Sequence, residues 1–277
     1  MSRNNQSRLS AQQPAFSVEP VSAFPQTHIT VSVPTEFVEL PSRGMYYPPE
    51  HPLHNKETIE IRYMTAKEED ILSSEALIKK GLVLERLIDS IIVDKSLDPG
   101  TLLVCDRSAI LIAARSSAYG NDYEAAVSCP FCSKKNEIVC DLHQFEPSYQ
   151  QPEIDVRVTT NGTCLVTLPK SQKTIEFRLY NGYDERSLSN VSEKNPTSNQ
   201  VTDQFKRVVL SIDGNQDFGL VHAFIMNMPA FDSRFLRKAI KQATPTTELR
   251  HKLVCDTCNQ ESVVEVPIGV KFFWPDF

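Results

Sequence analysis

Two Cys-x-x-Cys pairs constrain the fold of this chain more than any other sequence feature. They are Cys129 with Cys132 (CPFC) and Cys255 with Cys258 (CDTC), and each pair lies between two short runs of alternating apolar residues. Two intervening residues allow both sulfurs of a turn to reach one metal ion, and four thiolates complete the closed tetrahedral shell of structural Zn²⁺. We therefore expect one structural zinc ion, bound by two β-hairpins that together form a zinc ribbon.

The predicted ribbon is discontinuous, because residues 133–254 separate the two pairs. A metal that closes such a long loop removes much conformational entropy from the unfolded chain, which makes this arrangement physically reasonable. Two other interpretations stay open: a former site that no longer binds metal, and redox chemistry. A thioredoxin-like pair lies at a strand-to-helix junction, whereas both pairs here lead into predicted strands. Four cysteine ligands also leave no open position for a catalytic water.

The other cysteines, Cys105, Cys140 and Cys164, bring the total to seven. An odd number without a secretory signal argues against a disulfide framework. We expect these three to be ordinary buried thiols. The first residues contain no apolar signal core and no apolar run approaches about 18 residues, so we expect no membrane span and folding in a reducing cytoplasm.

Composition excludes several classes of function. The net charge is −6 and the pI is about 5.6. A protein that binds nucleic acid non-specifically needs an excess of Lys and Arg, so this composition argues against that class. The chain has only 9 glycines and no glycine-rich phosphate loop. Catalytic signatures such as HExxH and GxSxG are also missing, and we expect no enzyme. We interpret His51 and His54 as surface residues. The cations of residues 234–241 could bind nucleic acid or an acidic protein, but the acidic chain favours a solvated helix face.

The sequence predicts an α+β fold with a small helical bundle and antiparallel β elements around the zinc ribbon. Residues 1–34 are rich in Ser, Gln and Pro and are expected to form an extended or disordered arm. Toward the end of the arm, over residues 24–33, apolar and polar residues alternate to some degree. This end could pack on the surface of a partner protein. The further divisions are a Pro-rich segment, strand and helical bundle at 35–122, the ribbon at 123–145 and 246–277, and an insertion of strands followed by helices at 146–245.

Hydrophobic periodicity places the individual elements. Thr65 and Glu68 form a capping box that starts a helix ending near Gly81. Further helices are expected at about 83–93, 102–117, 204–212, 218–226 and 232–243. Strands are expected at 57–64, 123–127, 137–142, 249–254 and 262–266, and within 154–180. The polar stretch 187–202 is predicted to be a loop.

The C-terminal residues are unusually aromatic, with Phe272, Phe273, Trp274 and Phe277 close together. Left in water they would expose a large apolar patch, so we expect the segment to dock. It either packs on the chain's own ribbon or helices, or anchors in a neighbouring subunit, where Trp and Phe are favoured.

Several short motifs together resemble a known family. They are LPSRG followed by aromatic residues and prolines (40–48), MTAKEED (64–70), LLVCDRSAILIAARSSAYG (102–120) running into the first cysteine pair, and FFWPDF after the second. This arrangement is similar to the T4-type bacteriophage baseplate hub family. The resemblance covers about residues 36–277 and implies a role in assembly and structure, with no catalytic residues to transfer.

The resemblance implies a structural component of a contractile-tail baseplate, at or near the central hub, with a virion location after assembly in the host cytoplasm. Its implied partners are the hub protein and possibly the tape-measure protein or tail tube, with no membrane and with nucleic acid not the main partner. One alternative is a non-structural factor that helps the hub to form and then leaves. Another is a zinc-ribbon accessory protein that binds nucleic acid, although the second knuckle lacks flanking basic residues.

Overall fold

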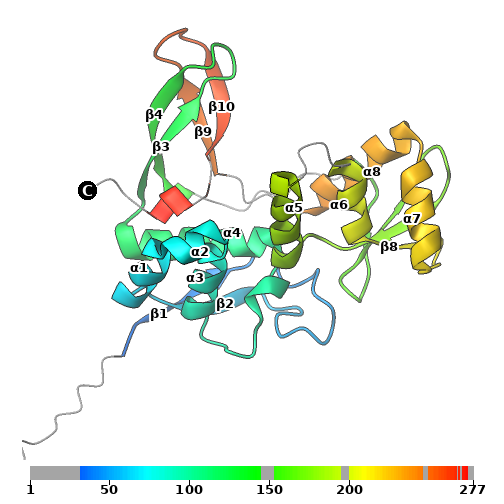
Figure 1. The fold of residues 1–277 in the computed structure, drawn as a ribbon, viewed down its shortest axis with the longest axis horizontal. Helices are drawn as coiled ribbons and strands as arrows, with labels where there is room; N and C mark the ends of the chain where they lie inside the picture. The colour runs from blue at the N-terminus through cyan, green and yellow to red at the C-terminus, as the bar shows by residue number, and fades with distance from the viewer. Residues whose placement is uncertain are drawn as a thin grey trace, which may run out of the picture. The chain divides into compact units, whose positions relative to one another are not determined.

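A computed structural model describes residues 32–144, 153–194, 200–245, 249–266, 268 and 270–273 (Figure 1). Apart from Ser32, the described part belongs to one compact unit, residues 33–277. Helices and antiparallel strands alternate along it, which confirms the α+β class. The predicted arm at residues 1–34 lies almost wholly outside the described residues. The subdivision of the remaining chain into three parts stays a prediction.

The first part of the unit is a β-hairpin packed on helices. Strands β1 (Thr35–Glu39) and β2 (Thr58–Arg62) pair antiparallel, with Thr35 opposite Arg62. The helices are α1 (Ala66–Ser73), α2 (Glu75–Lys79), α3 (Val83–Ile91) and α4 (Val104–Tyr119), with a 3₁₀ turn η2 (Pro99–Thr101) before α4. Leu87, Ile88 and Ile91 form the buried face of α3, as their helical spacing predicts.

The loop after β1 is held by a buried carboxylate on α4. Asp106 accepts hydrogen bonds from the Ser42 backbone N–H (2.9 Å), the Ser42 hydroxyl (2.6 Å) and the Tyr47 hydroxyl (2.8 Å). The Tyr47 oxygen in turn accepts the backbone N–H of Leu103 (3.0 Å). Burial raises the pKa of Asp106, although these donors oppose the rise. Ser42 and Asp106 belong to two of the motifs that carry the family resemblance, so their contact joins those motifs in space.

A second buried carboxylate starts α1. The predicted capping box is present, with Thr65 as the N-cap and Glu68 at the third helical position. Glu68 is fully buried and also binds the Arg62 guanidinium and the Ser90 hydroxyl (2.6 Å). The cluster therefore ties the end of β2 to α1 and α3. The expected single helix is interrupted, because Ser74 takes an extended conformation and divides it into α1 and α2.

The middle of the chain forms a four-stranded antiparallel sheet in the order β5-β6-β7-β8. Its strands are β5 (Arg157–Val158), β6 (Cys164–Thr167), β7 (Thr174–Phe177) and β8 (Val209–Ile212). Helices α5 (Gly182–Lys194) and α6 (Gln200–Val208) connect β7 to β8, while α7 (Phe218–Asn227) and α8 (Ala230–Ala243) follow β8. Asp232 on α8 accepts the backbone N–H groups of Lys170 (2.9 Å) and Ser171 (2.8 Å), which fixes the turn between β6 and β7.

Two predictions for this region are wrong. The expected loop at 187–202 is largely helical, because α5 and α6 extend into it from both sides; residues 195–199 lie outside the described part. The expected helix at 204–212 ends at Val208, and β8 follows directly. Residues 209–212 pair with β7, with Ile175 opposite Ile212, so sheet pairing overrides the helical pattern there.

The two cysteine hairpins are present as predicted. Strands β3 (Asp122–Ser128) and β4 (Lys135–Asp141) form the first, followed by a 3₁₀ turn, η3 (Leu142–Gln144). Strands β9 (Leu249–Val254) and β10 (Glu261–Val266) form the second. Figure 1 shows them side by side, and β3 contacts β10. The described chain ends in a short 3₁₀ helix, η4 (Val270–Phe273).

Candidate metal centre

The two knuckles have the same backbone geometry. In the first, the Cys129 N–H donates to the Lys134 carbonyl (2.8 Å) and the Ser133 N–H donates to the Cys129 carbonyl (2.9 Å). In the second, the Cys255 N–H donates to the Gln260 carbonyl (3.1 Å) and the Asn259 N–H donates to the Cys255 carbonyl (2.9 Å).

The residue after each second cysteine takes a positive φ, 58° at Ser133 and 54° at Asn259. This left-handed residue turns the chain back into the next strand, and Asn is among the residues that tolerate it best. Each turn therefore presents both of its sulfurs on one side of the hairpin.

The four predicted cysteines converge on one point. The Sγ atoms of Cys129 and Cys258 are 3.7 Å apart, and those of Cys132 and Cys255 are 3.6 Å apart. All four sulfurs lie within 4.8 Å of one another. A tetrahedron with metal–sulfur bonds of about 2.3 Å has edges of about 3.8 Å, so the cluster has the size that Zn²⁺ requires. The shorter separations exceed by far a disulfide bond of about 2.05 Å.

Asn136 joins the two hairpins beside this cluster. Its side-chain nitrogen donates to the Lys134 carbonyl (3.0 Å), and its side-chain oxygen accepts the backbone N–H of Asp256 (3.1 Å) in the other knuckle. Asn136 is buried, so the amide is shielded from competing water. Sequence reasoning missed this residue, because nothing in a lone Asn of a polar turn reveals a partner 120 positions away.

The surroundings of the four sulfurs favour the deprotonated thiolate form at Cys255. Backbone N–H groups of Cys258 and Thr257 point at the Cys255 sulfur and lower the pKa of its thiol to about 6. The backbone of Gln260 acts in the same direction on Cys258, but loss of solvent and the three neighbouring sulfurs outweigh it and raise the pKa of Cys258 to about 12. Four sulfurs this close cannot all carry charge without a cation between them.

The donor set therefore fits a structural metal. Cys129 and Cys255 are buried and Cys132 and Cys258 are half-buried, so a bound ion would be largely shielded from water. Four protein ligands close the tetrahedral shell, which is typical of structural sites and leaves no position for a substrate. When bound, the ion would supply a link between two hairpins that are distant in sequence. Cys105, Cys140 and Cys164 are buried elsewhere, as expected.

The C-terminal aromatic residues are only partly within the described chain. Phe272 and Phe273 are both fully buried. The Phe272 ring packs edge-to-face with Tyr123 on β3, with ring centroids 4.7 Å apart, and with Phe273, with ring centroids 5.3 Å apart. These two residues thus pack within their own chain. Trp274 and Phe277 lie outside the described residues, and their docking stays a prediction.

An arginine that sequence analysis did not single out holds this segment. Arg115 on α4 is buried and donates from Nε to the Phe272 carbonyl (2.9 Å), and from its terminal nitrogens to the carbonyls of Gly120 (2.9 Å) and Asp122 (3.2 Å). Its cation therefore binds η4, the end of α4 and the start of β3 together. His51 and His54, interpreted as surface residues, are each half-buried and hydrogen-bonded, His51 to Thr101 and His54 to the Tyr47 carbonyl.

Comparison with known protein families gives a match over most of the chain. The family described as T4 bacteriophage base plate protein matches residues 35–274. The chain belongs to this family. The match runs from β1 to the residue after η4 and so includes both knuckles of the baseplate protein. No curated protein and no solved structure matches it.

Membership of the family makes other phage baseplate proteins its partners and the virion tail its location. Among the described helices of this baseplate protein, none combines the length and apolar character that crossing a membrane requires.

Proposed function

We propose that this baseplate protein is a structural component at or near the central hub of a contractile tail, and that it catalyses no reaction. The observation that carries the proposal is the family match over residues 35–274. The resemblance of its motifs to the baseplate hub family supports the hub position. The hub protein and possibly the tape-measure protein or tail tube are the proposed neighbours.

We further propose that Zn²⁺ is the ion bound by the four cysteines. Four thiolates at tetrahedral spacing suit Zn²⁺, and the closed shell suits a structural role. The metal would hold the two ends of the long insertion together. This would make the folded protein more rigid where it contacts several neighbouring proteins.

Purified phage particles test the position. Cross-linking followed by mass spectrometry of intact virions should recover this chain and link it to the hub protein. The matched control is the same experiment on purified tail sheath and tube without baseplates, which should lack the chain. Links only to peripheral baseplate proteins would contradict the hub position.

The same particles separate the proposal from its nearest alternative. A non-structural assembly factor would be found in lysates and in baseplate intermediates but not in finished virions. Peptides of this chain at a fixed ratio to a known baseplate protein would exclude that alternative.

A further inference from the structure

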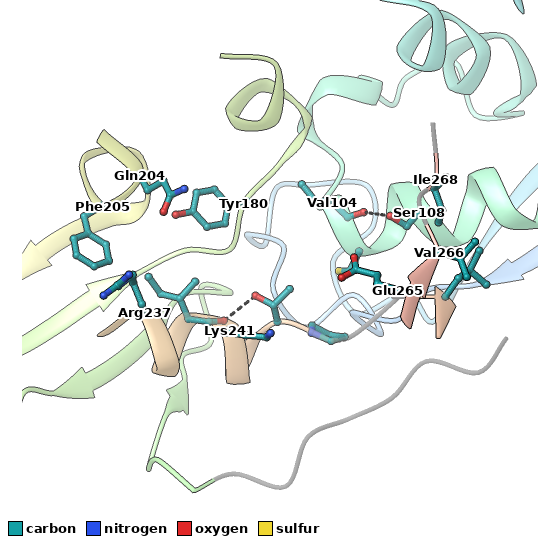
Figure 2. A pocket seen from close by; sticks show the side chains of 15 residues that line it. Val104, Ser108, Tyr180, Gln204, Phe205, Arg237, Lys241, Glu265, Val266 and Ile268 are labelled. Carbon is teal, nitrogen blue, oxygen red and sulfur yellow. Dashed lines mark hydrogen bonds between the residues drawn. The ribbon is translucent and has the colours of Figure 1, made fainter. Parts of the chain in front are cut away.

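A pocket of about 560 Å³ lies away from the metal centre, at the place where four parts of the fold meet. Its walls come from the start of α4, from α6, from α8 and from the lower end of β10 (Figure 2). Ligand pockets in proteins commonly enclose about 300–1,000 Å³. Nothing in the assembly role proposed above explains why an open pocket of this size exists here.

The interior of the pocket is mainly apolar. Phe205 from α6, Ile240 from α8 and Val266 from β10 line it and are buried in the fold. Tyr180 adds a hydroxyl, and burial raises its pKa to about 12, so the phenol stays a neutral hydrogen-bond donor. An apolar side chain of a ligand would lose unfavourable contact with water on entering.

One wall of the pocket is cationic. Arg237 and Lys241 lie one turn apart on α8 and both line the pocket (Figure 2). Within the described residues, neither has a carboxylate at ion-pair distance, whereas the neighbouring Lys238 pairs with Glu153. The pocket is also lined by Glu265, whose cross-strand neighbour on β9 is Arg250. The pocket thus offers two cations on one side of an apolar space, in a chain whose net charge is −6.

We propose that this pocket binds a peptide segment of another baseplate protein, one that combines an acidic side chain with an adjacent aromatic or aliphatic side chain. The acidic group would lie against Arg237 and Lys241, and the apolar group would enter the space formed by Phe205, Ile240 and Val266. The choice of a protein partner rests on the proposed assembly function. The chemistry of the walls by itself specifies an anionic and apolar ligand.

The pocket suits a peptide better than nucleic acid. Binding of single strands relies on exposed aromatic rings on which bases stack, together with a basic track along the backbone. Phe205 is 2% exposed and is no open platform for base stacking, and the pocket lining holds two cations, Arg237 and Lys241, which do not form a continuous basic track. A peptide needs only one acidic group beside one apolar group, which matches the two cations and the single apolar space.

Peptide display on the purified full-length protein tests the proposal without assuming a sequence. A random 12-residue library is selected on the wild-type protein and counter-selected on the double variant Arg237→Ser, Lys241→Ser. We expect enriched peptides to contain Asp or Glu next to Phe, Trp, Leu or Ile. The dissociation constant of the consensus peptide, measured by fluorescence anisotropy, should rise about five-fold for each cation removed and should rise further with salt.

Arg234→Ser is the matched control, because Arg234 is an exposed cation on the same helix that does not line the pocket. It should leave the dissociation constant unchanged. The proposal is overturned if no peptides are enriched, if enriched peptides lack acidic residues, or if the double variant binds the consensus peptide as tightly as Arg234→Ser does. It is also overturned if a 20-nucleotide single strand binds more tightly and competes with the peptide. Since the assay uses isolated protein, its outcome is independent of whether the chain is found in virions.

Discussion

Three buried charged residues hold together segments that are far apart in the chain. Asp106 binds the loop at Ser42, Glu68 binds Arg62 and Ser90, and Arg115 binds the backbone of η4. Each side chain has several hydrogen-bond partners, which is the condition under which a buried charge is tolerated. Removing one partner leaves the others unsatisfied at low dielectric, so single substitutions here should cost more than loss of surface charges would.

The first residue-level prediction concerns acid stability. Arg62, Ser90 and Thr65 outweigh the effect of burial and lower the pKa of Glu68 to about 2, from 4.5 in an unfolded chain. Because the folded pKa is depressed, the stabilisation is present above pH 4.5 and is lost as the pH falls toward 2. It amounts to about 3 kcal/mol. In urea unfolding between pH 3 and 7, the wild-type free energy of unfolding should fall more steeply with acid than that of Glu68→Gln.

Both proteins in that comparison have the same metal site, so acid release of the metal affects them equally and cancels in the difference. Parallel pH dependences in the two proteins would show that Glu68 has the same pKa in the folded and the unfolded chain, which would contradict the lowered pKa.

The second residue-level prediction concerns Arg115. Replacement by Met keeps the apolar stem but leaves three backbone carbonyls without donors, so Arg115→Met should lower the free energy of unfolding by about 3 kcal/mol. Arg115→Lys should recover only part of this, because an ammonium cannot reproduce the planar fork. Hydrogen exchange should show faster exchange at residues 270–273 in the Met variant. Unchanged exchange there would mean that the ring contacts of Phe272 suffice to hold η4.

Among the elements, the two cysteine hairpins depend most on something outside themselves. An isolated two-stranded hairpin is marginal in water, and the two hairpins meet through β3 and β10, the four cysteines and Asn136. The metal should therefore supply much of the stability of this region, since metal binding is coupled to folding at such sites.

Substitution of one ligand tests this at the element scale. Cys255→Ser should reduce the metal content from one zinc ion per chain to nearly none, as measured by elemental analysis. It should cost at least about 3 kcal/mol, which corresponds to a fall in Tm of roughly 6–12 °C. Cys140→Ser is the matched control, because Cys140 is a buried thiol on β4 of the first hairpin and lies outside the cluster. A wild-type protein that contains no zinc after expression with the metal in excess would contradict the assignment.

The end of the chain gives a second prediction at this scale. Phe272 and Phe273 are buried within the chain, which favours docking of the adjacent Trp274 on the same body. Trp274 is the only tryptophan, so its fluorescence reports on one site. We expect blue-shifted emission in the isolated protein. Emission like that of free tryptophan, shifting to the blue only when the hub protein is added, would instead identify an interface anchor. No shift in either state would show that the segment does not dock.

At the scale of the whole molecule, the body is the unit of residues 33–277, and the family match begins at residue 35. The arm that precedes it is too polar to bury a core of its own. Removing residues 1–32 should therefore change the Tm of the isolated protein by less than about 2 °C, while limited proteolysis of the intact chain should cut first within these residues. A large fall in Tm on truncation would mean that the arm packs on the body.

Local sequence patterns determined much of this protein. The alternation around each Cys-x-x-Cys predicted both hairpins, the capping box at Thr65 predicted the start of α1, and four thiols without a rival ligand set predicted the cysteine cluster. The hairpins and the capping box depend on residues within a few positions of one another. The cysteine cluster depends on metal coordination, for which these four thiols were the one suitable ligand set in the sequence. A single sequence is therefore enough to predict these features.

Tertiary structure decided the rest. Residues 209–212 form a strand because they pair with β7. Arg115 holds the C-terminal segment because η4 lies beside the end of α4. The pocket exists because α4, α6, α8 and β10 meet, although no local pattern predicts that Arg237 and Val266 line the same pocket. Each of these features depends on contacts between distant residues, whose energies exceed local propensities of a few tenths of a kcal/mol per residue.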